Sequence, residues 1–180
     1  MAATTSQLMT LEAFSQLPDD DGPVYHELRH GEFVEVTRPK LKHFFVQRNL
    51  RRLLENVAVP ESVVDTEFAF RALPEYELRV ADVAWVSAER LKDVDRESHF
   101  RGTPELVVEV LSPSNSASEI YDREKLCLEN GGREFWVVDP DRRQVKVSTP
   151  DGRTVTYQSG QEIPLPLFGN AKLAVNAIFD

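Results

Sequence analysis

Two acidic residues stand in stretches that otherwise have the pattern of buried strands. Asp82 lies within LRVADVAWV, and Glu109 lies within ELVVEVL. An ionised carboxylate in an apolar interior is strongly disfavoured unless it is paired, protonated or bound to a metal. Two such acids on successive strands can converge on one point, where a cation would relieve their repulsion. Carboxylates without nearby histidine or cysteine favour Mg²⁺ or Mn²⁺ over zinc.

Strand alternation places Asp82 on the face of Ala84, and Glu109 on the face of Val107. The alternative is that each acid pairs with a buried arginine or lysine, or lies at a strand end near solvent. For one acid alone that alternative is the simpler explanation. Two acids on neighbouring apolar strands, followed by a helix of mixed charge, favour a metal site. Such a metal could activate water and stabilise a phosphodiester transition state.

The elements that must position these acids alternate between helices and strands. Apolar spacing, caps and turn residues predict, in chain order, a helix at 10–17, a hairpin at 24–37, a helix at 43–57, strands at 63–73, 78–88 and 105–111, a helix at 116–130, a strand at 134–139 and a hairpin at 144–158. This order indicates an α+β fold with a mixed central sheet flanked by helices. No repeat or linker divides the chain, so we expect a single domain over residues 1–180.

Composition narrows the class of protein. The 180 residues are 41% hydrophobic and 28% charged, and no apolar run approaches the ~20 residues of a membrane span. The beginning of the chain lacks a basic segment followed by an apolar one, and the single cysteine excludes an internal disulfide. We therefore expect a cytoplasmic protein without a membrane partner. The net charge of −9 disfavours a broad basic face for DNA, although a nuclease site itself concentrates carboxylates.

Several stretches resemble the Uma-type family of restriction-endonuclease-like proteins, which belongs to the PD-(D/E)xK nuclease superfamily. They are GEF at 31–33, His43 at a helix start, Asp82 in its strand, ELVVEVLSPSNSASE at 105–119 and GGREFWVVDPDRRQVKV at 131–147. The resemblance runs from about Tyr25 to the end of the chain. It implies a restriction-endonuclease-like core with extra β-hairpins. In that core Asp82 matches the Asp of PD, Glu109 matches the acid of (D/E)xK, and both bind Mg²⁺.

The lysine of the motif is missing from its usual place, because Leu111 stands two positions after Glu109. The resemblance moves that lysine onto the next helix, four residues after Glu119, where this chain has Arg123. Arg123 can stabilise phosphate charge, but its pKa above ~12 makes it a poor proton acceptor. It can equally form a plain ion pair with Glu119. Either Lys125 reaches in, or metal alone activates the water, or the site is inactive.

Three further residues complete the candidate site. Glu32, in the GEF stretch, is a further metal ligand or an acid beside the metal, unless it is an exposed strand residue. Glu27 is another acid of the same hairpin and the weaker candidate. His43 could orient water or contact phosphate where it opens its helix, or serve only as a local cap.

The residues and the resemblance together predict a Mg²⁺-dependent endonuclease that hydrolyses DNA, with Mn²⁺ as the alternative ion. One alternative function is a catalytically impaired nuclease-fold module that binds nucleic acid or protein. Another is a metal-dependent hydrolase acting on a different substrate. A homodimer stays open, because cutting both strands of a duplex needs two sites.

Overall fold

A central sheet of seven strands forms the body of the protein. The computed structural model describes residues 8–18, 22–73, 75–92, 94–95, 97–113 and 115–180. The strands follow the spatial order β5-β3-β4-β6-β7-β8-β9. Their bounds are β3 Val63–Arg71, β4 Arg79–Val86, β5 Phe100–Arg101, β6 Leu106–Val110, β7 Glu134–Asp139, β8 Gln144–Ser148 and β9 Thr154–Gln158. Neighbours are antiparallel except β3–β5 and β6–β7, so the predicted mixed sheet of an α+β fold is confirmed.

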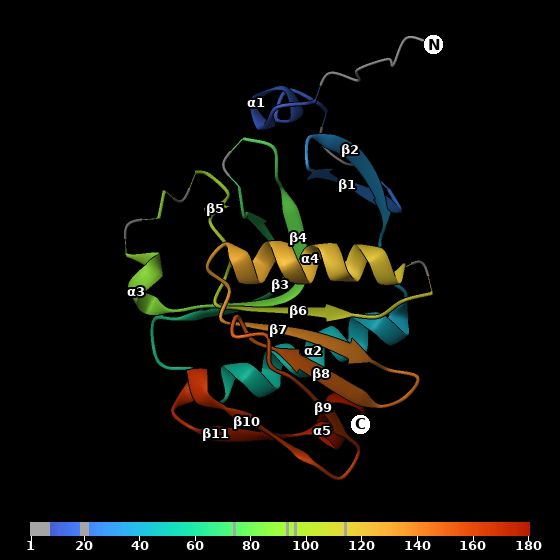
Figure 1. Ribbon diagram of the computed structural model, residues 1–180, viewed down its shortest axis with the longest axis vertical. Helices are drawn as coiled ribbons and strands as arrows, with labels where there is room; N and C mark the ends of the chain where they lie inside the picture. The colour runs from blue at the N-terminus through green and yellow to red at the C-terminus, as the bar shows by residue number, and fades with distance from the viewer. Residues whose placement is uncertain (1–7, 19–21, 74, 93, 96, 114) are drawn as a thin grey trace.

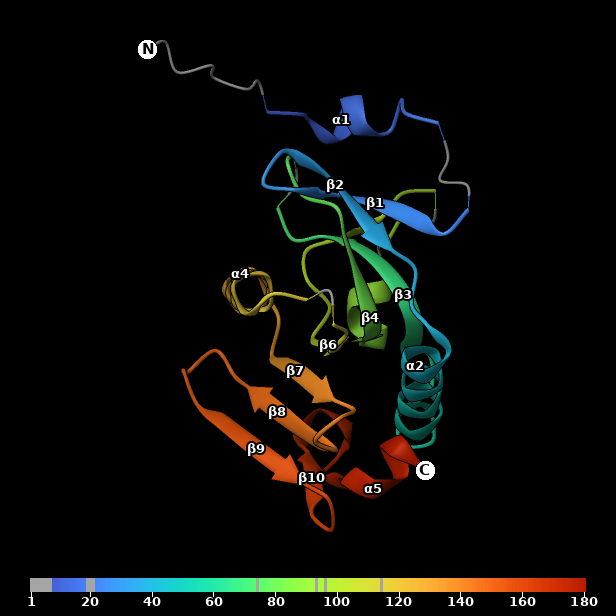
Figure 2. The same ribbon diagram turned by 90° about the vertical axis from the view of Figure 1, so that its right-hand side faces the viewer.

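Two long helices cover opposite faces of this sheet (Figures 1 and 2). Helix α2 (Leu41–Glu55) buries Val46, Leu50 and Leu54 against one face. Helix α4 (Ala117–Glu129) buries Leu126 and Cys127 against the other. Each helix carries apolar residues at helical spacing, so the side that faces the sheet is buried. The sheet is therefore the middle layer of three, and side chains from both helices can reach its strands.

Helix α4 begins and ends where local chemistry dictates. The Ser116 side chain accepts from the backbone N–H of Glu119, and the Glu119 carboxylate accepts from the backbone N–H of Ser116, which forms a capping box. At the other end Gly131 has φ of 101°, a conformation that stops the helix at little steric cost. Between these limits, Arg123, Leu126 and Cys127 are the buried residues of α4.

A hairpin formed by β1 (Val24–Arg29) and β2 (Glu32–Thr37) lies beside the ends of β3 and β4 (Figure 2). Its turn has positive φ at both His30 and Gly31, as a two-residue turn between twisted strands requires. Leu28 bridges to Leu78, just before β4, and thereby attaches the hairpin to the sheet. Helix α1 (Leu11–Phe14), capped by Thr10 as predicted, lies at the same end of the molecule.

The chain after β9 forms a second small sheet of β10 (Glu162–Leu165) and β11 (Ala171–Ala174), separated by the 3₁₀-helix η1 (Pro166–Phe168). Helix α5 (Val175–Phe179) follows. This segment buries Ile163, Leu165 and Ile178 in the cluster that α2 covers. Helix α3 (Ala88–Leu91) follows β4. Within the described residues, no helix is long and apolar enough to cross a membrane.

Candidate active site

Strands β4 and β6 separate at the two acids identified in the sequence. Their last antiparallel pair at this end is Val83 with Val108. The next position in the same register places Asp82 opposite Glu109. On the other side of β4, the ladder with β3 skips the position that would pair Asp82 with Glu67. Acids from three neighbouring strands therefore occupy adjacent positions across the sheet, where the backbone pairing is interrupted.

An irregularity in β4 decides which way Asp82 points. Ala81 and Ala84 pack in the same cluster on the α4 face, although strict alternation would put them on opposite faces. Glu67, on the neighbouring strand, has φ of 51°, which is uncommon for a residue other than glycine. Asp82 contacts side chains of α2, on the opposite face from α4. The prediction that Asp82 shares a face with Ala84 is therefore wrong.

Asp82 is held by donors from α2 and β6. Its Oδ2 accepts from the Val110 N–H at 2.6 Å, and its Oδ1 accepts from Gln47 Nε2 at 2.9 Å. Gln47 also donates to Glu67 Oε1 at 2.6 Å, so one amide serves both acids. His43 Nε2 lies 3.2 Å from Asp82 Oδ2 and 2.8 Å from the Val110 carbonyl oxygen. The Asp82 side chain keeps 16% exposure, so solvent still reaches it.

On this side of the sheet, the pKa values of both His43 and Glu67 are raised. Burial opposes charge on His43, yet its contacts with Asp82 and the Val110 carbonyl raise the pKa of its imidazole above the usual value. Burial raises the pKa of Glu67, opposed by the Gln47 hydrogen bond and reinforced by the charge of Asp82. His43 Nδ1 is buried and has no hydrogen-bond partner in the described part of the chain. A charged His43 would thus sit as a cation beside Asp82.

Glu109 has a different partner, the guanidinium of Arg123 on α4. Arg123 Nη1 donates to Glu109 Oε1 at 3.0 Å and to the Val80 carbonyl at 2.8 Å. Its Nη2 donates to the two carboxylate oxygens of Glu27 at 2.9 and 2.6 Å. All three charged side chains are buried. Arg123 therefore joins β6 to β1 through two buried carboxylates.

The pKa values of the two carboxylates move apart because Arg123 serves them unequally. Burial raises the pKa of Glu109 to about 8, while its single bond from Arg123 pulls the other way. Burial also disfavours charge on Glu27, but Arg123, Arg29 and the Val80 N–H bring the pKa of its carboxyl below the usual value. Glu27 thus keeps its charge at neutral pH, whereas the pKa of Glu109 stays raised despite its ion pair with Arg123.

Of the other predicted residues, some lie beside the acids and some do not. Arg123 faces the acids from α4, whereas Lys125 is exposed on that helix. Glu32 is exposed on β2, and among the described contacts neither Glu32 nor Lys125 touches Asp82 or Glu109. Of the two hairpin acids it is Glu27, and not the expected Glu32, that reaches the cluster. Glu27 is fully buried on β1, whereas Glu32 is exposed on β2.

Two residues of the site were missed in the sequence. Gln47 follows His43 by four residues on the predicted helix, and that spacing alone puts them on one helix face. Glu67 stands in VVDTEFAF, where only its acidic type in a strand pattern marked it.

The donor set suits a hard divalent cation. Asp82, Glu109 and the Val110 carbonyl offer oxygen atoms, which Mg²⁺ and Mn²⁺ prefer. Among the described residues, no group of three or more histidine, cysteine, aspartate or glutamate side chains is arranged around one metal position. Asp82 could therefore hold an ion that takes water or phosphate as its other ligands, as Mg²⁺ commonly does, whereas Glu109 would first have to release Arg123.

A cleft of about 1110 Å³ opens beside Glu67. It lies between α1, the β1–β2 hairpin and strands β3 and β4, and its lining includes Tyr25, His26, Arg38, Arg71 and His99. The lining reaches Glu67 but includes neither Asp82 nor Glu109, and its basic and aromatic side chains are of the kinds that contact phosphates and bases.

Comparisons with known proteins agree with this fold. The model of the Uma2 family, described as "Putative restriction endonuclease", matches residues 11–176. A crystal structure titled as that of "a putative nuclease belonging to DUF820" from Anabaena variabilis ATCC 29413 superposes with a TM-score of 0.80 at 22% identity. The alignment covers 95% of this chain and 97% of that one. A search of curated proteins finds no match. The predicted restriction-endonuclease-like fold is thereby confirmed.

Proposed function

The chain belongs to the Uma2 family, and from that membership we propose that it is a Mg²⁺-dependent endonuclease that hydrolyses DNA phosphodiester bonds. One observation carries the proposal. Asp82 and Glu109 lie at adjacent positions where β4 and β6 separate, and an open cleft reaches the neighbouring Glu67. Mn²⁺ has the same ligand preference and would serve in place of Mg²⁺.

Each residue has a defined part in this proposal. Asp82 and Glu109 would hold the ion, which supplies an activated water and stabilises charge on the scissile phosphate when bound. His43 holds a proton next to Asp82 and can orient water or donate to a phosphate oxygen. Arg123 keeps Glu109 in place and, always protonated, accepts no proton. Arg123 thus occupies the position of the lysine that the family resemblance implies, but it cannot act as a general base.

A second candidate function is a nuclease-fold module that binds nucleic acid without cutting it. The observation that favours it is the Arg123 guanidinium, which already neutralises Glu27 and competes with a metal for Glu109. A buried acid with its own arginine no longer requires a metal to be tolerated. Cleavage itself therefore has to be measured.

The test is a cleavage assay with supercoiled plasmid and labelled single strands in Mg²⁺, Mn²⁺ or EDTA. Asp82→Asn and Glu109→Gln keep the side-chain shape and remove the charge. Glu32→Gln makes the same change at an exposed acid of β2 and is the matched control. We expect metal-dependent nicking by the wild type and Glu32→Gln, reduced roughly 100-fold or more in the other two variants.

Two results would contradict the nuclease. Cutting that persists in Asp82→Asn and Glu109→Gln would come from a contaminant. DNA binding without cleavage in either metal would establish the second function in its place.

A further inference from the structure

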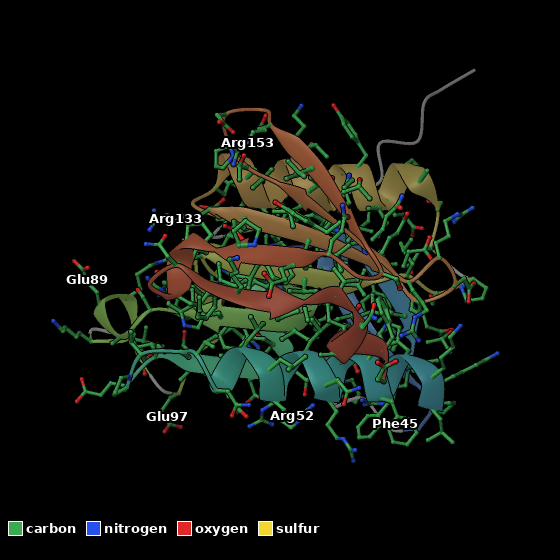
Figure 3. The ribbon with its side chains drawn as sticks, turned by 90° about the horizontal axis from the view of Figure 1, so that it is seen from below. Phe45, Arg52, Glu89, Glu97, Arg133 and Arg153 are labelled. Carbon is green, nitrogen blue, oxygen red and sulfur yellow. The ribbon has the colours of Figure 1, made fainter. Side chains whose placement is uncertain are left out.

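A stripe of apolar and basic side chains runs along the outer side of α2. Leu41, Phe45, Arg48 and Arg52 follow each other at spacings of four, three and four residues, which line up on one side of a helix. Phe44 lies next to Phe45, and the two side chains are 48% and 47% exposed. Figure 3 shows Phe45 and Arg52 pointing away from the sheet. Two neighbouring exposed phenylalanines beside two arginines indicate a contact surface.

A cavity of about 410 Å³ adjoins this α2 stripe. Its lining includes Lys42, Phe45 and Arg48 from α2, Arg143 from the turn before β8, and Phe179 from α5. The Arg48 guanidinium lies 5.3 Å from the ring centre of Phe45, and that of Arg143 lies 5.3 Å from that of Phe179. Aromatic rings paired with guanidinium groups form a surface that stacks flat, electron-rich groups and attracts anions.

The charge here is opposite to that of the whole chain. Lys42 pairs with Asp141, and Arg143 pairs with Asp180. Arg48 is in contact with Phe45, and neither Arg48 nor the exposed Arg52 has an ion-pair partner within the described residues. The α2 stripe is thus a local positive region on a protein of net charge −9. Charge complementarity points to a polyanion as its ligand.

We infer that the α2 stripe and its cavity bind single-stranded nucleic acid, with bases stacked on Phe44 and Phe45 and phosphates on Arg48 and Arg52. Exposed ring faces stack with unpaired bases, whereas the bases of a duplex are closed to them. A second copy of the chain is the poorer occupant, because a two-fold contact along this stripe would bring the unpaired arginines of both copies together.

This inference rests on the proposed function, because the nucleic-acid strand bound by the α2 stripe would be the one that enters or leaves the acidic site. His43, one turn before Gln47 on the same helix, contacts Asp82 from the inner side of α2. The α2 stripe starts at the same turn on the outer side. Along α2, Arg52 lies about 13 Å from His43, so the stripe extends the nucleic-acid path beyond the site.

The test is a titration of a fluorescent single-stranded oligodeoxynucleotide followed by anisotropy, in EDTA so that no cleavage occurs. Phe45→Ala and Arg48→Ala alter the stripe. Tyr121→Ala, at an aromatic residue that is 68% exposed on α4, and Arg153→Ala, far from Phe45 in Figure 3, are the matched controls. We expect Phe45→Ala to bind roughly 5- to 150-fold more weakly. We expect Arg48→Ala to reduce the slope of log K against log salt by about 0.7. Both controls should stay within about 2-fold of the wild type.

The outcomes separate this inference from the nuclease. Oligonucleotide binding lost in Phe45→Ala, with no cleavage by the wild type, would keep the binding surface and remove the enzyme. Unchanged binding in Phe45→Ala and Arg48→Ala, with cleavage lost in Asp82→Asn, would overturn the surface and keep the enzyme. No binding by the wild type at low salt would overturn the surface. So would a change of sedimentation in Phe45→Ala without a change in binding, because a second copy would then occupy it.

Discussion

The two faces of the sheet treat their acids in opposite ways. On the α2 face, Asp82 accepts from a neutral glutamine, a backbone N–H and a histidine, and stays partly exposed. On the α4 face, Glu109 is buried against the guanidinium of Arg123, which it shares with Glu27.

The difference shows two ways to keep a carboxylate in a folded protein. At a solvated edge, hydrogen bonds stabilise the charged carboxylate and leave some of its lone pairs free for a ligand. An interior ion pair neutralises the charge but commits the carboxylate to one partner, and breaking it leaves an uncompensated buried charge. The α2 side of the site is therefore ready for a cation. The α4 side must exchange a proton or loosen an arginine before it can take part.

The largest expected effect comes from removing that arginine. Arg123→Met should lower the free energy of unfolding by about 3 to 5 kcal/mol, because Glu27 and Glu109 lose their shared cation. Mn²⁺ should recover part of the loss by replacing the missing charge. Urea denaturation with and without Mn²⁺ measures both effects, and Arg123→Lys, which keeps a charge, is the control. A loss below about 1 kcal/mol in Arg123→Met would show that the ion pairs of Arg123 with Glu27 and Glu109 contribute little to stability.

The next effect is a dependence of stability on pH. Burial raises the pKa of Glu109 from 4.5 to about 8, so the folded protein binds one more proton than the unfolded chain between those values. This contribution to stability is fully present below pH 4.5 and is lost as the pH rises through about 8. The slope reaches at most about 1.4 kcal/mol per pH unit.

Glu109→Gln should flatten this curve. The raised pKa of His43 adds a fall in the same direction above its ordinary value of 6.5, and that part should remain in the variant. Urea denaturation of metal-free protein at several pH values measures the curves. Equal slopes in wild type and Glu109→Gln between pH 5 and 6.5 would contradict a raised pKa of Glu109.

A smaller effect tests the α2 side. Gln47→Ala removes the amide that bridges Asp82 and Glu67, and should cost about 1 kcal/mol of stability. The two acids then repel each other more strongly, so Mg²⁺ should raise the melting temperature more than it does in the wild type. Asn49→Ala, also on α2, loses amide bonds to the backbone carbonyls of Ile178 and Asp180; it is the matched control and should leave the metal response unchanged. A weaker response in Gln47→Ala would mean that Gln47 itself supports the ion.

The smallest effects are expected at Glu32 and Lys125. Both are exposed outside the cluster, so Glu32→Ala and Lys125→Ala should change stability by less than about 0.5 kcal/mol. Cleavage by Lys125→Ala should equal that of the wild type. A large loss of cleavage in Lys125→Ala would place that lysine at the substrate after all.

Much of the fold follows from local pattern. The capping box at Ser116, the His30–Gly31 turn and the apolar spacing of α2 depend on neighbours within a few residues, which the sequence shows directly. Asp82 and Glu109 could also be identified from the sequence, because a carboxylate within an apolar strand is unfavourable unless it has a partner, whatever the rest of the fold. Arg123 became a candidate through the family resemblance, which places the lysine of the motif four residues after Glu119.

The choice between hairpin acids was beyond such counting. Glu27 and Glu32 are both strand glutamates near one turn, and only the docking of β1 through Leu28 and Leu78 buries the first and exposes the second. The left-handed φ of Glu67 and the broken alternation at Asp82 arise where three strands meet two helices.

The sequence by itself determined the order of the main helices and strands up to β9, without α3 and β5, together with the mixed α+β class and the two acids in apolar strands, because these depend on short-range periodicity and residue type. The tertiary structure decided which partner each acid has: Gln47 and His43 for Asp82, and Arg123 with Glu27 for Glu109. Those partners come from segments far apart in the chain. Their pairing depends on burial and distance, which are properties of the packed molecule and leave no local pattern in the sequence.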